Sequence, residues 1–359
     1  MTQNLDAFIP ELWSRRIQYL TRNALVATQI CSFEEQPDLK YGDRIHRPYP
    51  NDLVVNDYVK YTDTTQQDLI GTDEYLDIDQ SKEISFAIDE VDWIQMKYDL
   101  ENSYVERAAY RLANDIDGKV LSEVVNAKVE LDAGDIGGTA GQAISLSTSN
   151  CLNAVMTAGA KLTANGCEMD KTWALVVWPK TAAVIAQTVA QDWFSLADLA
   201  LKNGYAGNFA GYKVYSSNNV MHSIPVTGTV TSGDKITVAW VEFTATAATL
   251  DNIASLINAS TDPKIKNAKI SASVANSTLT IVSSGKVIVT SSDLTVGDAV
   301  EYAILCRPGA IDLVMQQNID VRKNPLPKQK ADYYIISCLY GVKTFTEGAE
   351  RMVSLKLAA

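Results

Sequence analysis

Histidine and cysteine, the residues that most often carry catalytic or metal chemistry, are sparse in this chain of 359 residues. The two histidines, His46 and His222, cannot supply a three-histidine zinc site, and no HExxH sequence is present. The five cysteines are odd in number and include no CxxC pair, which predicts buried, reduced thiols. No GxSxG nucleophile motif occurs either. We therefore expect no catalytic centre, no metal and no cofactor.

Two glycine-rich stretches imitate phosphate-binding loops without matching them. In GTVTSGDK, residues 228–235, Asp234 separates the last glycine from the lysine that would have to reach the phosphates. GDIGGTAGQ, residues 134–142, lacks the GxGxxG spacing after a strand and is interpreted as a loop. Neither stretch predicts a nucleotide site.

Charge is distributed unevenly along the chain. Residues 1–130 hold 25 acidic and 13 basic residues, which is the entire net charge of −12. Within this part, residues 52–92 contain 12 acidic residues against Lys60 and Lys82. An acidic chain of this kind will not bind nucleic acid through its overall charge. The acidic stretch is either a solvated face or a charged contact surface.

A basic stretch near the C-terminus has the opposite sign. RKNPLPKQK, residues 322–330, is by itself a solvated loop, but it could also meet an acidic surface on a neighbouring subunit. The two stretches together favour the interaction hypothesis. Acidic residues of 52–92 would then face basic residues of another copy: Arg322, Lys323, Lys328 and Lys330.

The elements that must carry these residues follow from periodicity. Residues 8–30, which begin FIPELWSRRIQYL, are interpreted as an amphipathic arm or helix; the stretch lacks the features of a secretory signal, and no membrane span is expected. Residues 40–50 indicate a strand entry broken by Pro48 and Pro50. Period-two alternation in 52–88 predicts a long, acidic, two-stranded excursion with a turn at 71–74.

Residues 89–128 change to helical spacing, and we expect one rod of roughly 60 Å, with two helices broken near Gly118 as the alternative. Asp115 and Lys119 have the spacing of an i,i+4 ion pair. Residues 145–223 alternate helix and strand, whereas 224–298 predict a small β-rich module inserted into a larger domain.

The order of these pieces resembles the major capsid proteins of tailed double-stranded-DNA bacteriophages with the Hong Kong 97 type of shell fold. The resemblance covers nearly the whole chain except 224–298, and each motif is loose by itself. It is carried by the following stretches: FIPELWSRRIQYL, KYGDRIHRPYP, ERAAYRLANDIDGKVL, LTANGCEMDKTWALVVWPKTAAVI, LKNGYAGNFAGYKVYSSNNV, PGAIDLVMQ and YYIISCLYGVKTF.

The resemblance implies an α+β Hong Kong 97-like capsid fold. Its parts would be an N-terminal arm (1–39), an extended β-hairpin loop (40–88), a peripheral domain with a long spine helix (89–144 and 331–359), an axial domain (145–223 and 299–330) and the inserted β-rich domain (224–298). Such subunits are made in the bacterial cytoplasm and assemble as hexamers and pentamers into an icosahedral shell. The shell encloses DNA without sequence-specific binding, and it works with a portal and, in some members, a separate scaffolding or decoration protein.

The resemblance also implies where subunits meet, through the arm, the extended loop and, by the charge hypothesis, the basic stretch. We expect Trp13 to anchor the arm on a neighbour. Because the arm motif begins at Phe8, we expect no cleaved scaffolding segment before it. A Lys60–Asn324 cross-link between subunits has no independent support from the spacing. The expected contact residues are Phe8, Trp13, Arg16, Asp57, Lys60, Asp63, Arg322, Lys323, Lys328 and Lys330.

Three other functions were weighed. An encapsulin-like compartment shares the shell architecture but encloses cargo enzymes, and the FIPELW opening and the insert favour a phage over it. A β-rich surface adhesin fits the composition of 224–298, but the missing export signal and the five cysteines argue against it. An α/β enzyme lacks any paired nucleophile and base.

Overall fold

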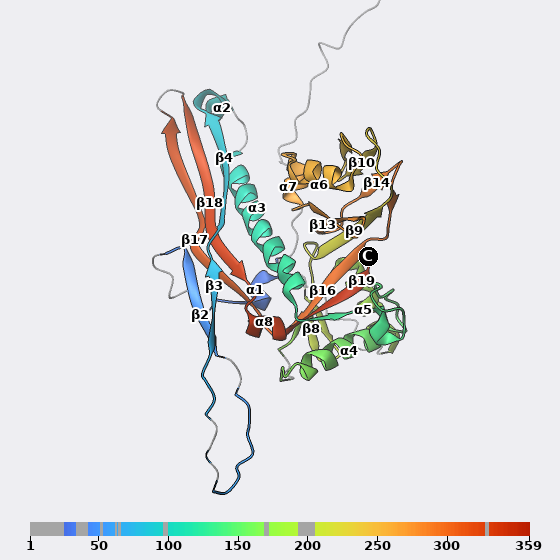
Figure 1. The fold of residues 1–359 in the computed structure, drawn as a ribbon. Helices are drawn as coiled ribbons and strands as arrows, with labels where there is room; N and C mark the ends of the chain where they lie inside the picture. Colours follow the sequence, from blue (N-terminus) through green and yellow to red (C-terminus); the bar gives the residue numbers. More distant parts are fainter. Residues whose placement is uncertain are drawn as a thin grey trace, which may run out of the picture.

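The computed structural model describes residues 25–33, 42–50, 53–61, 63, 66–95, 100–168, 172–192, 205–326 and 330–359. The molecule is elongated: a long twisted sheet with a helix along it forms one side, and two smaller lobes lie beside that helix (Figure 1). A narrow loop projects from the lower end of the sheet side. Of the expected arm, residues 1–39, only 25–33 are described.

The long sheet is built from segments far apart in the sequence. Its strands, in spatial order, are β1 (Cys31–Ser32), β17 (Ile311–Leu326), β18 (Ala331–Lys343) and β4 (Gln80–Asp89). The alternation predicted for residues 80–88 is confirmed, because β4 exposes every second side chain and turns the others toward α3 (Leu100–Ser122). The division expected between residues 330 and 331 falls in the turn of the β17–β18 hairpin, the most extensive strand pair of the molecule.

The rod predicted over residues 89–128 is shorter than expected. The described parts are α2 (Glu90–Gln95), α3 with 23 residues, and a 3₁₀ helix (Glu123–Asn126). At 1.5 Å per residue α3 measures about 35 Å. The alternative break at Gly118 is also wrong, because Gly118 lies inside α3. The apolar face of α3 is buried against the sheet and the first lobe at Ala108, Leu112, Ile116 and Val120.

The projecting loop is rooted in a short hairpin, β2 (Arg44–Pro50) and β3 (Gly71–Asp77). Two predictions are wrong here: β2 runs through Pro48 and Pro50, and residues 71–74 open β3 instead of forming a turn. The prolines are tolerated because β3 is the only described strand that pairs with β2, so the other edge of β2 needs no N–H donors there. The alternating residues 54–61 form no strand.

The lower lobe in Figure 1 is centred on part of a ten-stranded sheet covered by two helices, α4 (Cys151–Ala164) and α5 (Pro179–Asp192). The predicted buried strand in TWALVVWP is confirmed as β6, whose four residues are all buried. The strands are β5 (Val129–Leu131), β6 (Ala174–Val177), β7 (Tyr205–Phe209), β8 (Tyr212–Ser216), β9 (Met221–Thr227), β12 (Ser271–Ala275), β13 (Thr278–Ser284), β15 (Thr295–Val296), β16 (Val300–Cys306) and β19 (Met352–Ala358).

Residues 224–298 form the upper lobe, which has its own hydrophobic core. We call this segment the β-rich module. Strands β9, β12, β13 and β15 enter it from the ten-stranded sheet, and a separate sheet is added by β10 (Lys235–Val238), β11 (Val241–Thr244) and β14 (Val289–Ser291). The amphipathic helix α6 (Leu250–Asn258) buries Ile253 and Ile257 in this core and is followed by α7 (Pro263–Asn267). A last short helix, α8 (Thr346–Glu350), joins β18 to β19.

Candidate intersubunit surfaces

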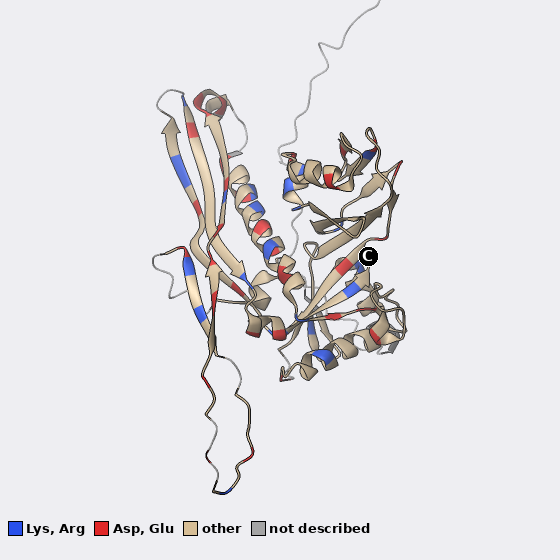
Figure 2. Cartoon of the chain, in the orientation of Figure 1, with Lys and Arg blue, Asp and Glu red and all other residues tan. Residues whose placement is uncertain are grey.

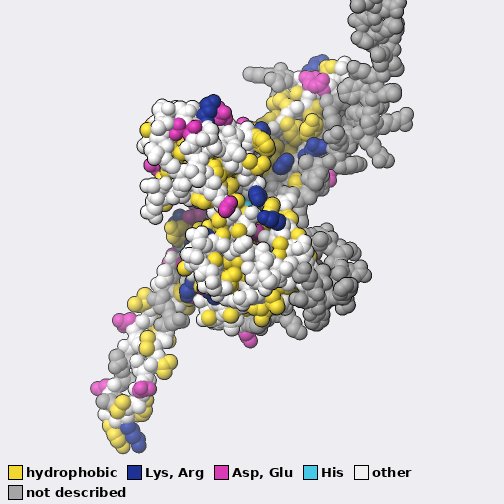
Figure 3. All heavy atoms as spheres, turned by 90° about the vertical axis from the view of Figure 1, so that its right-hand side faces the viewer, with side chains coloured by type: hydrophobic (Ala, Val, Ile, Leu, Met, Phe, Trp, Pro, Cys, Tyr) yellow, Lys and Arg dark blue, Asp and Glu magenta, His cyan; other side chains and the backbone are white. Residues whose placement is uncertain are grey.

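The loop between β2 and β3 presents large apolar side chains to solvent. Val55 and Tyr61 are each 95% exposed, and acidic side chains lie among the apolar ones (Figure 3). The exposed set in this loop comprises Leu53, Val54, Val55, Tyr58, Val59, Tyr61, Leu69 and Ile70. So many large apolar side chains exposed on one loop are typical of a contact site and not of a free surface.

The side chain of Gln67 joins the two sides of the loop. The N–H of Val54 donates to Oε1 of Gln67 over 2.9 Å, and Nε2 of Gln67 donates back to the carbonyl of Val54. Gln67 therefore satisfies both backbone groups of Val54, as a paired strand would do. The result is a narrow ribbon that needs no core of its own.

The root of the loop, by contrast, is fixed firmly to the body. Leu76 is fully buried with Val314 and Phe345. Arg47 lies 3.1 Å from Glu347 and 3.5 Å from Asp312. These contacts fix the base of the loop to the body of the subunit, while the side chains of the loop itself stay exposed.

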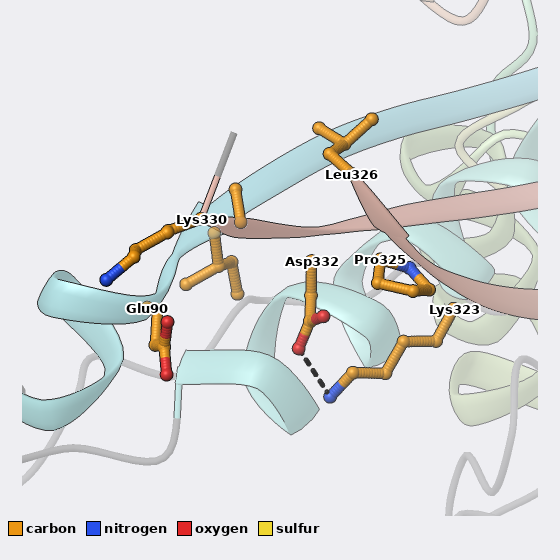
Figure 4. A pocket seen from close by; sticks show the side chains of 8 residues that line it. Glu90, Lys323, Pro325, Leu326, Lys330 and Asp332 are labelled. Carbon is orange, nitrogen blue, oxygen red and sulfur yellow. Dashed lines mark ion pairs between the residues drawn. The ribbon is translucent and has the colours of Figure 1, made fainter. Parts of the chain in front are cut away.

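The basic stretch lies at the far end of the β17–β18 hairpin, where it borders a pocket of about 440 Å³ (Figure 4). Lys323 already has partners in its own chain, Asp332 at 3.1 Å and Glu101 at 3.5 Å. Its contact with Tyr334 and Asp332 raises the pKa of Lys323, so the ammonium stays charged. The pocket is lined by Ile88, Glu90, Lys323, Pro325, Leu326, Lys330, Ala331 and Asp332.

The other basic residues of this stretch differ in whether they already form an ion pair within the chain. Arg322 pairs with Asp320 at 3.0 Å on the exposed face of β17. Lys330 is exposed, and no ion pair joins it to a carboxylate among the residues that the structure describes. Lys328 lies outside the described residues. Lys330 is therefore the described cation of this stretch that remains for a neighbour.

The structure places the predicted contact residues in two separate regions. Asp57, Lys60 and Asp63 lie in the projecting loop, and Lys60 is 5.8 Å from the ring of Tyr61. In Figures 1 and 2 this loop and the end of the β17–β18 hairpin lie at opposite ends of the molecule. They therefore cannot meet within one chain. The expected arm contacts, Phe8, Trp13 and Arg16, lie outside the described residues.

One turn of α3, residues 114–118, joins several parts of the chain and was not predicted as a site. The buried Asp117 accepts the backbone N–H groups of Val26 and Ala27 at 2.7 and 2.8 Å, and the Asn219 amide at 2.8 Å. Burial raises the pKa of Asp117, and these hydrogen bonds oppose the rise. Asp117 thus fixes the start of α1 (Ala27–Ile30) to α3 and to the connection between β8 and β9.

The same turn of α3 also contacts the β-rich module. Asp115 Oδ1 lies 3.2 Å from Lys269 Nζ, and Oδ2 accepts the Tyr340 hydroxyl at 3.0 Å. The predicted Asp115–Lys119 pair is therefore wrong. Lys119 pairs instead with Glu123 at 3.3 Å. The sequence signal for these contacts is the set of polar residues Asn114, Asp115 and Asp117 beside the apolar face of α3.

The lack of a side chain at Gly118 lets the β-rich module approach α3 closely. A Cβ added there would lie 2.6 Å from Ser284 Oγ, a distance that real Cβ atoms do not show. The glycine leaves room for the side chain of Ser284, and it does not break the helix. The residue that suggested a helix end is thus a contact point between α3 and β13.

Two further buried titratable groups lie where the lower lobe meets the module. Glu301 accepts the N–H of Trp178 at 2.7 Å and the hydroxyl of Thr181 at 2.5 Å, so it caps the start of α5; burial raises the pKa of Glu301. His222, opposite Glu301 in the sheet, contacts the carbonyl of Val220 at 2.8 Å. Burial lowers the pKa of His222 to about 4. Both groups belong to the packing of the sheet.

Metal or nucleotide chemistry finds no support in the described ranges. No group of three or more His, Cys, Asp or Glu side chains in them could hold a metal ion. The carboxylate of Asp234, which interrupts the phosphate-loop spacing, accepts the N–H and hydroxyl of Thr231 and closes a turn. None of the five cysteines forms a disulfide, as expected. None of the helices described combines the length and apolar character needed to cross a membrane.

Comparison with known proteins relates the chain by fold. No protein-family model and no curated protein matches its sequence. Among solved structures, a chain from Mycobacterium phage Che8 is 18% identical with a TM-score of 0.64, and the match covers 98% of each chain. A chain of the cyanophage P-SCSP1u capsid is 10% identical, with a TM-score of 0.60 over 100% of this chain and 95% of that one.

A third solved structure extends the same relation. A chain of the capsid of Myoviridae phage XM1 is 11% identical with a TM-score of 0.56, and the match covers 99% of both chains. These matches span the long sheet, both lobes and the projecting loop, because they leave almost none of the chain uncovered. The chain is thus a mixed α and β protein with the fold of solved bacteriophage capsid chains.

Proposed function

We propose that the chain is the major capsid protein of a tailed double-stranded-DNA bacteriophage, with the Hong Kong 97 type of fold. In this proposal it assembles as hexamers and pentamers into an icosahedral shell around the genome and resides in the virion. The similarity in fold to phage capsid chains along the whole length supports the proposal. The acidic chain will not bind DNA through its overall charge, so in this proposal it encloses the genome without sequence-specific binding.

The parts of the subunit take the following roles in the proposal. The long sheet and α3 form the peripheral domain, and the part of the ten-stranded sheet covered by α4 and α5 forms the axial domain. The loop between β2 and β3 is the extended loop, and residues preceding α1 form the arm. The β-rich module is an insertion in the axial part. This grouping places β17 and β18 in the same domain, whereas the division expected at residue 330 assigned them to two different domains.

The observation that carries the proposal is the exposed apolar loop. Its side chains contribute nothing to the cores of the described chain, yet its root is held rigidly by Arg47 and Leu76. Apolar surface kept exposed at a fixed position stabilises only an assembled state, because burial against a neighbour removes it from water. The loop therefore fits a contact with another copy of the chain.

The charged residues predict which surface of the neighbouring subunit faces the loop. The loop carries Asp57 and Asp63, both exposed, and Lys330 is the described cation of the basic stretch without a carboxylate partner among the residues described. The two lie at opposite ends of one subunit, so they can meet only between subunits. We infer that Lys330, together with Lys328, faces the acidic loop of a neighbour.

The test replaces Val55 and Tyr61 together by serine. Both side chains are 95% exposed, so the midpoint of thermal unfolding of the separate subunit should not change. The yield of assembled particles in sedimentation should fall at least about tenfold, which corresponds to about 1.4 kcal/mol of lost contact energy. Val125→Ser, on the exposed 3₁₀ helix, is the matched control. Normal particle yield from the double variant would contradict the role given to the loop.

A further inference from the structure

The β-rich module carries an exposed tryptophan in an unfavourable backbone conformation. Trp240 and Ala239 form the two-residue turn between β10 and β11, with φ of 66° and 52°. A turn with two left-handed residues ordinarily uses Asn-Gly or a similar pair, because a side chain on an L-residue is strained there. The Trp240 side chain is nevertheless 71% exposed, so core packing does not explain its presence.

A second hairpin of the same module provides the comparison. Asn276 and Ser277 form the two-residue turn between β12 and β13, with φ of 48° and 60°. Asparagine tolerates this region, and both side chains are small and polar. The module therefore closes one hairpin with residues suited to the turn and the other with a large aromatic residue. Strain of this kind, without a folding benefit, points to a function outside the subunit.

Trp240 belongs to a small apolar patch. The N–H of Ala239 donates to the carbonyl of Ile288 over 3.0 Å, which places the Ile288 segment beside the turn. The Ile288 side chain is 52% exposed. The module is close to neutral, because residues 224–298 hold six acidic and five basic residues, and Glu242, two residues beyond Trp240, is paired with Lys235 at 2.7 Å. A partner at this patch must therefore be apolar.

The size of the patch decides which partner it fits. Trp240 and Ile288 together expose on the order of 250 Å² of side chain, whereas a stable complex between independent proteins buries about 800 Å² on each partner. The patch is too small to hold a separate soluble protein. It suffices between molecules that other contacts already hold side by side, because their effective concentration is high.

We propose that Trp240 and Ile288 form a contact between the β-rich module of one subunit and a second copy of the chain in the assembled shell. This inference rests on the proposed function, because only a shell holds the copies side by side. The turn strain weakens the isolated subunit, and burial of the indole between copies stabilises the assembly.

The experiment uses the full chain with Trp240→Gly, which relieves the turn and removes the apolar side chain. Unassembled W240G subunits should melt about 2 °C higher than wild type, while W240G particles should release subunits in denaturant about tenfold faster. Ser277→Gly is the matched control: it places a glycine at the same position of the other turn, removes no large apolar side chain, and should leave particle dissociation unchanged. Ile288→Thr, which keeps the strained turn, should speed particle dissociation without stabilising the subunit.

Hydroxyl-radical footprinting gives a direct readout. Oxidation of Trp240 should fall severalfold from unassembled subunits to particles. Equal oxidation in both, or W240G particles that dissociate at the wild-type rate, would overturn the inference. Failure of the wild-type chain to form particles would instead contradict the proposed function, so the two failures are distinguishable.

Discussion

The ammonium of Lys269 lies 3.2 Å from the carboxylate of Asp115, a residue 154 positions earlier in the chain. Both side chains are about three quarters buried. Lys269 belongs to the β-rich module and Asp115 to α3, so the pair fixes the module to the helix that lies along the long sheet. Desolvation lowers the pKa of Lys269, and Asp115 opposes this effect.

Replacing Lys269 by methionine should loosen this attachment. The variant keeps most of the apolar stem but leaves Asp115 with the Tyr340 hydroxyl alone. We expect a loss of about 1–2 kcal/mol in the free energy of unfolding, because the pair is partly buried. Urea denaturation measures it. Lys235→Met, which breaks the exposed pair with Glu242, should change the free energy far less. Equal effects of the two variants would contradict the attachment role.

The buried His222 predicts how stability depends on pH. Its pKa is about 4 in the folded chain, against 6.5 when exposed. Between these values the unfolded state binds the proton and the folded state does not, so the free energy of unfolding falls as the pH falls from 6.5 to 4. The difference corresponds to about 3 kcal/mol. Above pH 6.5 the stabilisation is fully present.

His222→Gln isolates this contribution. The raised pKa of Glu301, opposite in the sheet, acts in the other direction, because its folded form takes up a proton more readily as the pH falls. The comparison is therefore made between variants. His222→Gln should flatten the loss of stability from pH 6.5 to 4. Identical pH profiles for wild type and His222→Gln would show that His222 is not the titrating group.

Charge reversal at Lys330 tests the proposed direction of the loop contact. Lys330→Glu should slow assembly at low salt, and added salt should affect this variant less than the wild type, because the attraction is already lost. Light scattering follows the rate. Lys266→Glu, on the exposed surface of α7, reverses an equivalent charge away from the contact and should assemble normally. Assembly of the Lys330 variant at the wild-type rate at every salt concentration would exclude this pairing.

The fold was predictable from the sequence in segments where the pattern of apolar residues reflects which side chains are buried. The run ALVV of β6 is apolar throughout because all four side chains are buried, and α6 shows helical spacing because Leu250, Ile253 and Ile257 face one core. Residues 54–61 have the alternation of a strand but form none. A period of two predicts a strand when one face is buried, and here both faces are exposed.

The candidate surfaces were predictable only in outline. The acidic and basic stretches are visible in the sequence as runs of charge. Whether a basic residue can bind a neighbouring subunit depends on its ion pairs within the chain: Arg322 pairs with Asp320, and Lys323 pairs with Asp332. Asp115 was assigned to Lys119, the neighbour that helical spacing suggests, although its partner is Lys269. Spacing along one helix cannot reveal a partner brought in by tertiary packing. The sequence alone does not identify Trp240 as a contact residue, because that inference depends on the backbone angle φ of Trp240 in its turn.

Electron microscopy of the purified full-length chain tests the central claim most directly. A shell subunit whose apolar loop needs a neighbour should appear as closed shells or as rings of five and six copies at micromolar concentration, and the Val55 and Tyr61 double variant should not. Closed shells or such rings are the predicted result. A wild-type chain that remains a stable, well-folded single subunit under all assembly conditions would contradict the account.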